Sequence, residues 1–222
     1  MQLHVFSFGQ SAKYRQVFEG FLALRKRKFV DELGWSLKHQ GGLERDQYDR
    51  PGALYSIVTR NGQVVAGARA LSCGAVDGRW SYMLKDAADG KLDGIPGGLM
   101  DVYPSDNSAW ECTRFATDEA LAYTSSHCIE TKLIVAGLCS GARSLGAKKL
   151  LSLSSRALGV LLRRFGYQVQ RQPNRYLCED DQREYFAFVM GCDPMVNDDL
   201  FRQYAPPLAL DHAQELELSG AA

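Results

Sequence analysis

Six charged residues stand where the neighbouring sequence is apolar or aromatic, a setting that favours a charged site inside a cleft. They are Arg25, Asp46, Asp49, Arg69, Glu111 and Arg114. A buried charge without a partner is costly, so such residues pair with one another or bind a charged ligand. Guanidinium groups suit carboxylates, and a carboxylate beside aromatic rings suits a general base. The six residues predict a charged network inside a cleft that forms a site, with a purely structural ion network as the alternative.

Arg25 belongs to a helix predicted from Ser11 to about Leu33 and ended by Gly34. The apolar residues of this helix, such as Phe18 and Leu22, form one stripe, and Arg25 lies near its centre. Two interpretations remain open. Either Arg25 reaches solvent from the edge of the core, or the helix faces a polar pocket where Arg25 binds an anion or braces an acid.

Asp46 and Asp49 lie in a polar, turn-rich stretch at 36–51, where acids exposed to solvent are the alternative. Strands must position the other three charged residues. Alternation along a predicted strand at 63–71 puts Arg69 on the same face as Val65 and Leu71. The strand at 110–115, WECTRF, carries Glu111 and Arg114. These two side chains point to opposite faces of a regular strand, so a bulge is needed if they are to meet.

The remaining pattern predicts one mixed α/β sandwich. Further strands are expected at 1–8, 53–59, 149–154, 167–172 and 184–190, and further helices within 119–145 and at 155–165. Asn61-Gly62 joins an early hairpin, and 86–106 is expected to be a long loop. We expect a single domain over 1–193, and a peripheral, irregular C-terminal tail over 194–222.

Composition excludes several classes of protein. The 222 residues are 45% hydrophobic and balance 26 basic against 26 acidic side chains, so a general nucleic-acid partner is not expected. No apolar run reaches the roughly 18–20 residues of a membrane span, and the polar start is unlike a secretory signal. The six cysteines form no C-x-x-C pair, so we expect no metal site and a reducing cytoplasm.

The charged residues and their neighbours resemble the acyl-homoserine-lactone synthases, the autoinducer synthases of bacterial quorum sensing. The shared motifs are Arg25-x-x-x-Phe29, Gly34-Trp35, Asp46-x-x-Asp49, Gly67-x-Arg69, Trp110-Glu111-x-x-Arg114-Phe115 and Tyr82-Met83-Leu84. The resemblance spans roughly residues 1–190, and the order and spacing match throughout.

The resemblance implies acyl transfer from a thioester, carried by acyl carrier protein or coenzyme A, to the amine of S-adenosylmethionine. Lactone closure then releases 5′-methylthioadenosine. S-adenosylmethionine is a substrate, so no cofactor is expected. The implied fold is a three-layer α/β/α sandwich around a mixed sheet, acetyltransferase-like, with a V-shaped cleft between strands.

The resemblance and the physics of the side chains together suggest roles. Glu111 is the candidate base, while Asp46 and Asp49 pair with Arg69, Arg114 or the substrate ammonium. Arg25, Phe29 and Trp35 are expected at the S-adenosylmethionine site, because a guanidinium suits its carboxylate and aromatic rings suit adenine and the sulfonium. Plain core packing is the alternative for the two aromatic residues.

The acyl side of the reaction is assigned to hydroxyl residues. Ser152 and Ser154 share one face of their strand, and family members keep hydroxyls there to line the acyl pocket. Thr113, where the family commonly has Ser, is assigned to the same acyl pocket. Ala87-Ala88 stand where the family usually has a Phe, and both positions lie near segments that shape acyl preference. A basic cluster, Lys148, Lys149, Arg163 and Arg164, with Arg156 nearby, is the expected docking surface for an acidic carrier protein. A solvated helix face is the alternative.

Two rival functions remain. An N-acetyltransferase using acyl-coenzyme A would hold pyrophosphate in a Gly-rich loop, and Arg143-Ser-Leu-Gly146-Ala-Lys148 matches part of that pattern. A non-catalytic module that senses acyl lactones or S-adenosylmethionine is the second, although it has no need of Glu111 as a base.

Overall fold

One seven-stranded sheet forms the centre of the computed structural model, which describes residues 1–118, 128–192 and 196–205. The strands in spatial order are β1 (Gln2–Ser7), β4 (Ala53–Arg60), β5 (Gln63–Ser72), β6 (Ala109–Thr117), β7 (Lys149–Ser155), β9 (Glu184–Gly191) and β8 (Val169–Leu177). Neighbouring strands are antiparallel except β6 and β7, which are parallel. The mixed sheet expected from the sequence is therefore present.

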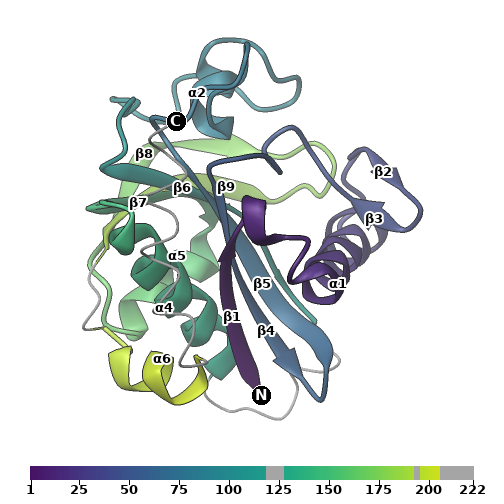
Figure 1. Ribbon diagram of the computed structural model, residues 1–222. Helices are drawn as coiled ribbons and strands as arrows, with labels where there is room; N and C mark the ends of the chain where they lie inside the picture. Colours follow the sequence, from purple (N-terminus) through teal and green to yellow (C-terminus); the bar gives the residue numbers. More distant parts are fainter. Residues whose placement is uncertain (119–127, 193–195, 206–222) are drawn as a thin grey trace.

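Helices cover both faces of this sheet (Figure 1). One face carries α1 (Arg15–Arg25), which continues into the π-helical turn η2 (Lys26–Glu32), and a small hairpin of β2 (His39–Gln40) and β3 (Leu43–Glu44). The other face carries α4 (Ile129–Ser144), α5 (Arg156–Arg164) and α6 (Asp198–Tyr204). A 3-10 turn, η1 (Phe8–Gln10), follows β1, and the short helix α2 (Met83–Ala88) precedes β6. The three-layer sandwich is confirmed.

Alternation along β4 explains how one sheet serves two cores. Leu54 and Val58 pack in the core beneath α4, whereas Tyr55 and Ile57 pack in the core beneath α1. Gly67 on β5 brings α1 close, because a Cβ at that position would lie 2.7 Å from the Phe21 ring.

The parallel strands β6 and β7 separate near the middle of the sheet. Among the described residues their pairing runs only from Ala109 opposite Lys149 to Cys112 opposite Ser152. On its other side β6 bulges: Arg69 faces Thr113 but Gly67 faces Ala116, and Arg114 has a left-handed φ of 55°. The sequence predicted that a bulge is needed if Glu111 and Arg114 are to point to one face, and β6 contains a bulge at Arg114.

Some expected boundaries were wrong. The first helix begins at Arg15 rather than Ser11, and α2 occupies part of the segment expected to be a loop. The tail expected from 194 onward is not wholly irregular, because α6 packs on α4 and buries Phe201 in the core. Residues 119–127, 193–195 and 206–222, which include part of the predicted second helix and most of the tail, lie outside the described residues. No described helix is long and apolar enough to cross a membrane.

Candidate active site

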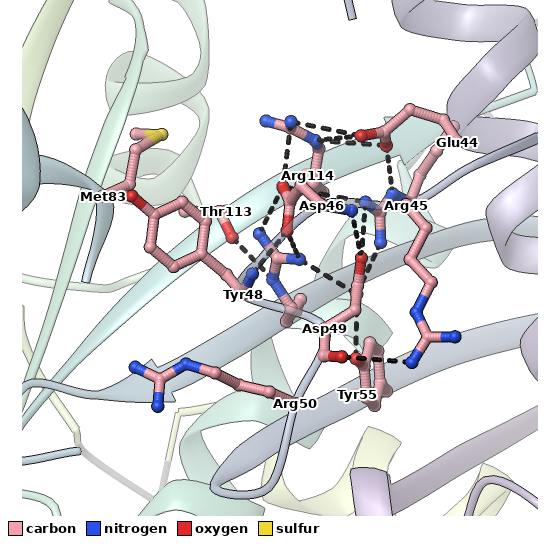
Figure 2. Close-up of polar contacts among 12 residues, drawn as sticks. Glu44, Arg45, Asp46, Tyr48, Asp49, Arg50, Tyr55, Met83, Thr113 and Arg114 are labelled. Atoms are coloured by element: carbon pink, nitrogen blue, oxygen red, sulfur yellow. Dashed lines mark hydrogen bonds and ion pairs between the residues drawn. The ribbon is translucent and has the colours of Figure 1, made fainter. Parts of the chain in front are cut away.

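Three arginines and three carboxylates form one buried ion network on the α1 face of the sheet (Figure 2). Arg25 ends α1, Arg69 comes from β5 and Arg114 from β6. Glu44 ends β3, and Asp46 and Asp49 follow it in the segment that leads to β4. Five of the six residues predicted from the sequence therefore meet in one place.

Arg25 is fully enclosed in this network. Its Nε donates to Glu44 Oε2 at 2.6 Å, and its two Nη atoms donate to Asp49 at 2.8 and 3.0 Å. All of its guanidinium nitrogens are therefore held by protein carboxylates, and the side chain is not exposed. Of the interpretations left open by the sequence, the geometry favours bracing of acids, and it does not favour a bond from Arg25 to a substrate carboxylate.

Asp46 and Arg114 form the open side of the network. Arg69 donates from both Nη atoms to Asp46 at 2.5 and 3.0 Å, and Arg114 Nη2 lies 2.9 Å from Asp46 Oδ2. The side chains of Asp46 and Arg114 are 12% and 10% exposed, whereas those of Arg69 and Asp49 are completely buried. Asp46 and Arg114 are therefore the members of the network that contact solvent.

The arginines keep the acids ionised. Burial alone would raise the pKa of Asp46, but Arg69 and Arg114 outweigh it and lower that pKa to about 2. Burial also raises the pKa of Asp49, but the charges of Arg69 and Arg25 outweigh it and hold that pKa well below its usual range. Tyr55 Oη and the Asp46 backbone N–H also donate to Asp49. Asp46 and Asp49 are therefore ionised at neutral pH.

Glu44 is the member that the sequence reading missed. It is buried, accepts from Arg25 Nε, and also accepts from Arg114 Nε and Nη2 at 3.2–3.3 Å. The available signal was its spacing, since residues two apart in an extended segment point to the same side, which places Glu44 with Asp46 and turns Arg45 outward. Among the described residues, no His, Cys, Asp and Glu gather into a metal-binding group.

Glu111 lies beside the network but has different partners. Its carboxylate accepts from the backbone N–H of Met83 at 2.7 Å and of Leu84 at 2.9 Å, the first two residues of α2. Burial raises the pKa of Glu111 to about 7, although these two N–H groups and Arg69 act in the opposite direction. Glu111 is thus a buried carboxylate that can change protonation near neutral pH.

A second buried acid, Asp86, joins α2 to the network. It accepts from Tyr48 Oη at 3.0 Å and from the Ser81 backbone N–H, and Lys91 Nζ lies 3.0 Å away. The Tyr48 ring in turn lies under the guanidinium of Arg69, 5.6 Å from ring centroid to Cζ. The sequence reading missed both Tyr48 and Asp86.

Phe29 and Trp35 stack on each other at the edge of the network. Their ring centroids are 4.9 Å apart with an interplanar angle of 18°. Arg114 Cζ lies 5.7 Å from the centre of the Phe29 ring. Phe29 is buried in the core on the α1 face, as the core-packing alternative expected, and Trp35, which is partly exposed, packs against that core.

Ser152 and Ser154 line an apolar cavity of about 40 Å³ on the opposite face of the sheet. Cys112 and Phe115 of β6 line it too, together with residues of α4, α5 and β9. Thr113 lies elsewhere: its Oγ1 accepts from Arg69 Nε at 3.1 Å, on the face of the ion network. The expectation that Thr113 lines the same pocket as the two serines does not agree with this placement.

The basic residues expected to dock a carrier are all exposed. Lys148 and Lys149 lie at the start of β7 and Arg163 and Arg164 at the end of α5. The Val169 carbonyl accepts from Arg163. Val169 on β8 and Leu150 on β7 both lie opposite Met190 on β9, so the lysine pair and the arginine pair are at the same end of the sheet. This is the end where β6 and β7 still pair; Arg156, at the start of α5, lies at the end where they have separated.

Comparison with known proteins agrees with this arrangement. A family model described as autoinducer synthase matches residues 9–197. An acyl-homoserine-lactone synthase from Aeromonas hydrophila is 28% identical over 153 residues, which are 68% of this chain and 69% of that protein.

Solved structures show the same fold. A CoA-dependent acyl-homoserine lactone synthase, BjaI, solved with SAM and isopentyl-CoA, superposes with a TM-score of 0.71 at 20% identity over 96% of this chain and 98% of its own. An acyl-CoA N-acyltransferase from Pseudomonas aeruginosa superposes with a TM-score of 0.53 at 15% identity, over 85% of this chain and 99% of its own. The acetyltransferase-like sandwich is thereby confirmed, and the family match over most of the chain goes further: this protein belongs to the autoinducer synthase family.

Proposed function

We propose that this enzyme acylates the amine of S-adenosylmethionine from an acyl thioester and closes the product to an N-acyl-L-homoserine lactone. In the first step an amide bond forms and the carrier thiol leaves. In the second, the methionyl carboxylate attacks its own γ-carbon, the bond from that carbon to the sulfonium sulfur breaks, and 5′-methylthioadenosine departs as a neutral thioether. The reaction consumes S-adenosylmethionine as a substrate and requires no further cofactor.

One observation carries this proposal: polar and apolar halves of a site lie on opposite faces of the sheet where β6 and β7 separate. The ion network and Glu111 lie on the α1 face, and the cavity lined by Ser152 and Ser154 lies on the α5 face. A zwitterionic amine donor suits the first. The apolar lining of the second suits the carbons of an acyl chain, for which the cavity must widen from about 40 Å³. The thioester carbonyl would then lie in the gap between the two strands.

Glu111 is suited to remove the proton from the attacking amine. Free α-amino groups titrate at about 7.7–8.0, so most of the substrate arrives protonated at neutral pH. A carboxylate whose pKa is about 7 is matched to that task, and each of its oxygens keeps a second lone pair for a water or for the amine. Backbone N–H groups of β6 beyond Cys112, where pairing with β7 has stopped, are candidate donors to the developing oxyanion.

The remaining residues hold the substrate. Asp46, at the open side of the network, is placed to accept from the substrate ammonium, and Arg114 to bind its carboxylate. Trp35, which is partly exposed, offers an aromatic face to the adenine or the sulfonium, and the buried Phe29 packs behind it. Holding the carboxylate in line with the γ-carbon contributes several kcal/mol to lactone closure through orientation alone.

The N-acetyltransferase alternative is weaker. The loop Arg143–Lys148 that half-matches its phosphate motif follows the C-terminus of α4 and precedes a strand. The C-terminal end of a helix carries partial negative charge, which disfavours phosphate.

A product assay separates the two functions. Purified enzyme is incubated with S-adenosylmethionine and a set of acyl carrier protein and coenzyme A thioesters. We expect stoichiometric 5′-methylthioadenosine and a lactone of matching acyl mass. Acylation without methylthioadenosine would instead assign a transferase, and binding without any product would assign a sensor.

The donor would be acyl carrier protein or acyl-coenzyme A. For an acidic carrier protein, the exposed Lys148, Lys149, Arg163 and Arg164 are the proposed docking surface. We also propose that the enzyme works in the cytoplasm. All six cysteines are free thiols, as in proteins of a reducing compartment.

A further inference from the structure

A hydrogen-bonded link joins the segment after η2 to the turn between β8 and β9, 146 residues along the chain. The indole Nε1 of Trp35 donates to Asp181 Oδ2 at 2.8 Å, and Tyr185 Oη donates to the same oxygen at 2.6 Å. Beside it, the Ser36 backbone N–H donates to Asp180 Oδ2 at 3.1 Å. The Asp181 carboxylate accepts two side-chain donors and lies outside the ion network.

The link fixes the orientation of the Trp35 ring. Gly34 has a φ of 71°, and the turn it makes allows the Trp35 N–H to donate to the Phe29 carbonyl at 2.8 Å. One face of the indole then stacks on Phe29, and Tyr185 meets it edge-on, with centroids 5.9 Å apart and planes at 71°. Stacking alone leaves a ring free to slide and rotate in its plane, whereas a hydrogen bond at Nε1 removes that freedom.

Charge strengthens the bond at the indole. Burial opposes ionisation of Asp181, but bonds from Tyr185 and Trp35 outweigh it and lower the pKa of Asp181. An ionised acceptor forms shorter and stronger hydrogen bonds than a neutral one. Tyr185 donates to the same oxygen and so holds the carboxylate in turn.

We propose that Asp181 is a positioning residue for S-adenosylmethionine: it holds Trp35 in the orientation in which the indole meets this substrate. The inference rests on the proposed function, and it extends the substrate site to the β8–β9 turn. Pre-orienting an aromatic wall lowers the entropic cost of binding the molecule that touches it. The effect should therefore fall on S-adenosylmethionine and not on the acyl donor.

The test compares steady-state kinetics with both substrates for four single variants and one double variant of the full chain. Asp181→Ala removes the acceptor and Trp35→Phe removes the donor while keeping an aromatic ring. We expect each to raise KM for S-adenosylmethionine about five- to tenfold, the value of one hydrogen bond, with kcat and KM for the acyl donor within about twofold. Because the two variants break the same bond, the double variant should be little worse than either one.

Two further variants separate orientation from general stability. Asp181→Asn keeps an acceptor for Nε1 and should restore most of the affinity. Glu179→Ala removes an exposed acid from the same turn and should behave as wild type. Thermal unfolding of each variant reports any loss of fold.

Three outcomes would overturn the inference: an unchanged KM for S-adenosylmethionine in Asp181→Ala, equal losses for both substrates, or fully additive effects in the double variant. Wild-type enzyme is assayed first for lactone. A wild type that forms lactone while Asp181→Ala binds S-adenosylmethionine normally refutes the positioning role alone. A wild type without lactone refutes the proposed function.

Discussion

Glu111 and Asp46 show how neighbours decide the state of a buried carboxylate. Both are acids removed from water, yet the pKa of Asp46 falls to about 2 while that of Glu111 rises to about 7. Asp46 lies against two guanidinium groups, whereas Glu111 has only two backbone N–H donors in contact. One is therefore a permanent anion that orients charge, and the other can exchange a proton.

The pKa of Glu111 predicts the pH dependence of the first step. A general base must be ionised, so kcat/KM should rise as the pH increases through about 7. Glu111→Gln should lower kcat about 100-fold or more, abolish that rise, and leave S-adenosylmethionine binding in place. Turnover against pH and calorimetric binding provide the measurement. Unchanged turnover in Glu111→Gln would show that Glu111 is not the base.

Acid stability should follow Asp46 and Asp49. Their folded-state pKa values lie below the unfolded value of about 3.9, so their stabilising contribution is complete above that pH. It is lost as the pH falls through the folded values, and the urea midpoint should therefore drop steeply below about pH 4. The effect of Glu111 on stability runs the other way. Because folding raises the pKa of Glu111, its contribution to the free energy of unfolding is complete below about pH 4.5 and declines as the pH rises to about 7. A urea midpoint that stays flat from pH 5 to 2.5 would contradict the ion-network account.

Ser152 offers a residue-level test of acyl preference. Its side chain lines the apolar cavity, where a hydroxyl can bond a 3-oxo or 3-hydroxy group. Ser152→Ala should lower kcat/KM about five- to tenfold for 3-substituted donors and much less for plain chains. Competition between the two donor types, read by lactone mass, gives the ratio directly. Equal losses of kcat/KM for both donor types would contradict a hydrogen bond from Ser152 to the 3-substituent.

At the scale of elements, the site depends on one irregular strand. A regular β6 would direct Glu111 and Thr113 to one face and Arg114 to the other. The bulge at Arg114 returns this guanidinium to Glu44 and Asp46, while Cys112 and Phe115 line the cavity behind. Beyond Cys112 the loss of pairing with β7 leaves room between the two halves of the site.

Contact between α1 and β5 holds Arg25 in register with this strand. The contact depends on Gly67, where a Cβ would lie 2.7 Å from the buried Phe21 ring. Gly67→Ala should lower the free energy of unfolding by about 1–3 kcal/mol through overpacking, and reduce turnover as the network shifts. Gly191→Ala is the matched control, because a Cβ at that position on β9 would have nothing within 4 Å. Urea denaturation of the two variants makes the comparison; equal stability would contradict the packing argument.

At the scale of the whole molecule, the sheet separates two kinds of chemistry. Helices cover an apolar core on each face (Figure 1), but the buried ion network lies only on the α1 face and the apolar cavity only on the α5 face. The net charge of zero hides an uneven distribution, since exposed lysines and arginines collect at one end of β7 and α5. Local charge of this kind affects association more than it affects fold.

Charge reversal tests where a carrier protein docks. Lys148→Glu combined with Lys149→Glu should lower kcat/KM for acyl carrier protein donors about tenfold at low salt, and less at high salt. The same change should leave coenzyme A donors nearly unaffected. Arg156→Glu, at the end where β6 and β7 have separated, is the comparison variant. A loss confined to Arg156→Glu would move the docking surface to that end of the sheet.

Local patterns in the sequence were enough to predict the seven strands of the central sheet, its mixed character and most of the charged residues of the site, but not the small hairpin of β2 and β3. Period-two alternation revealed Arg69 among apolar residues, and the spacing of Glu111 and Arg114 required a bulge that β6 contains. These features depend on residue types a few positions apart, which can be compared along the chain without knowledge of the fold.

The partner of each charged group, in contrast, became known only from the folded arrangement. Arg25 is bound by acids and closed to ligands, Glu44 joins the network, and Thr113 faces Arg69 instead of the cavity. Trp35 meets Asp181 across 146 positions of sequence. The physical reason is that burial and pairing are set by segments that fold together from far apart, and the energy of a charge depends on those neighbours far more than on its own residue type.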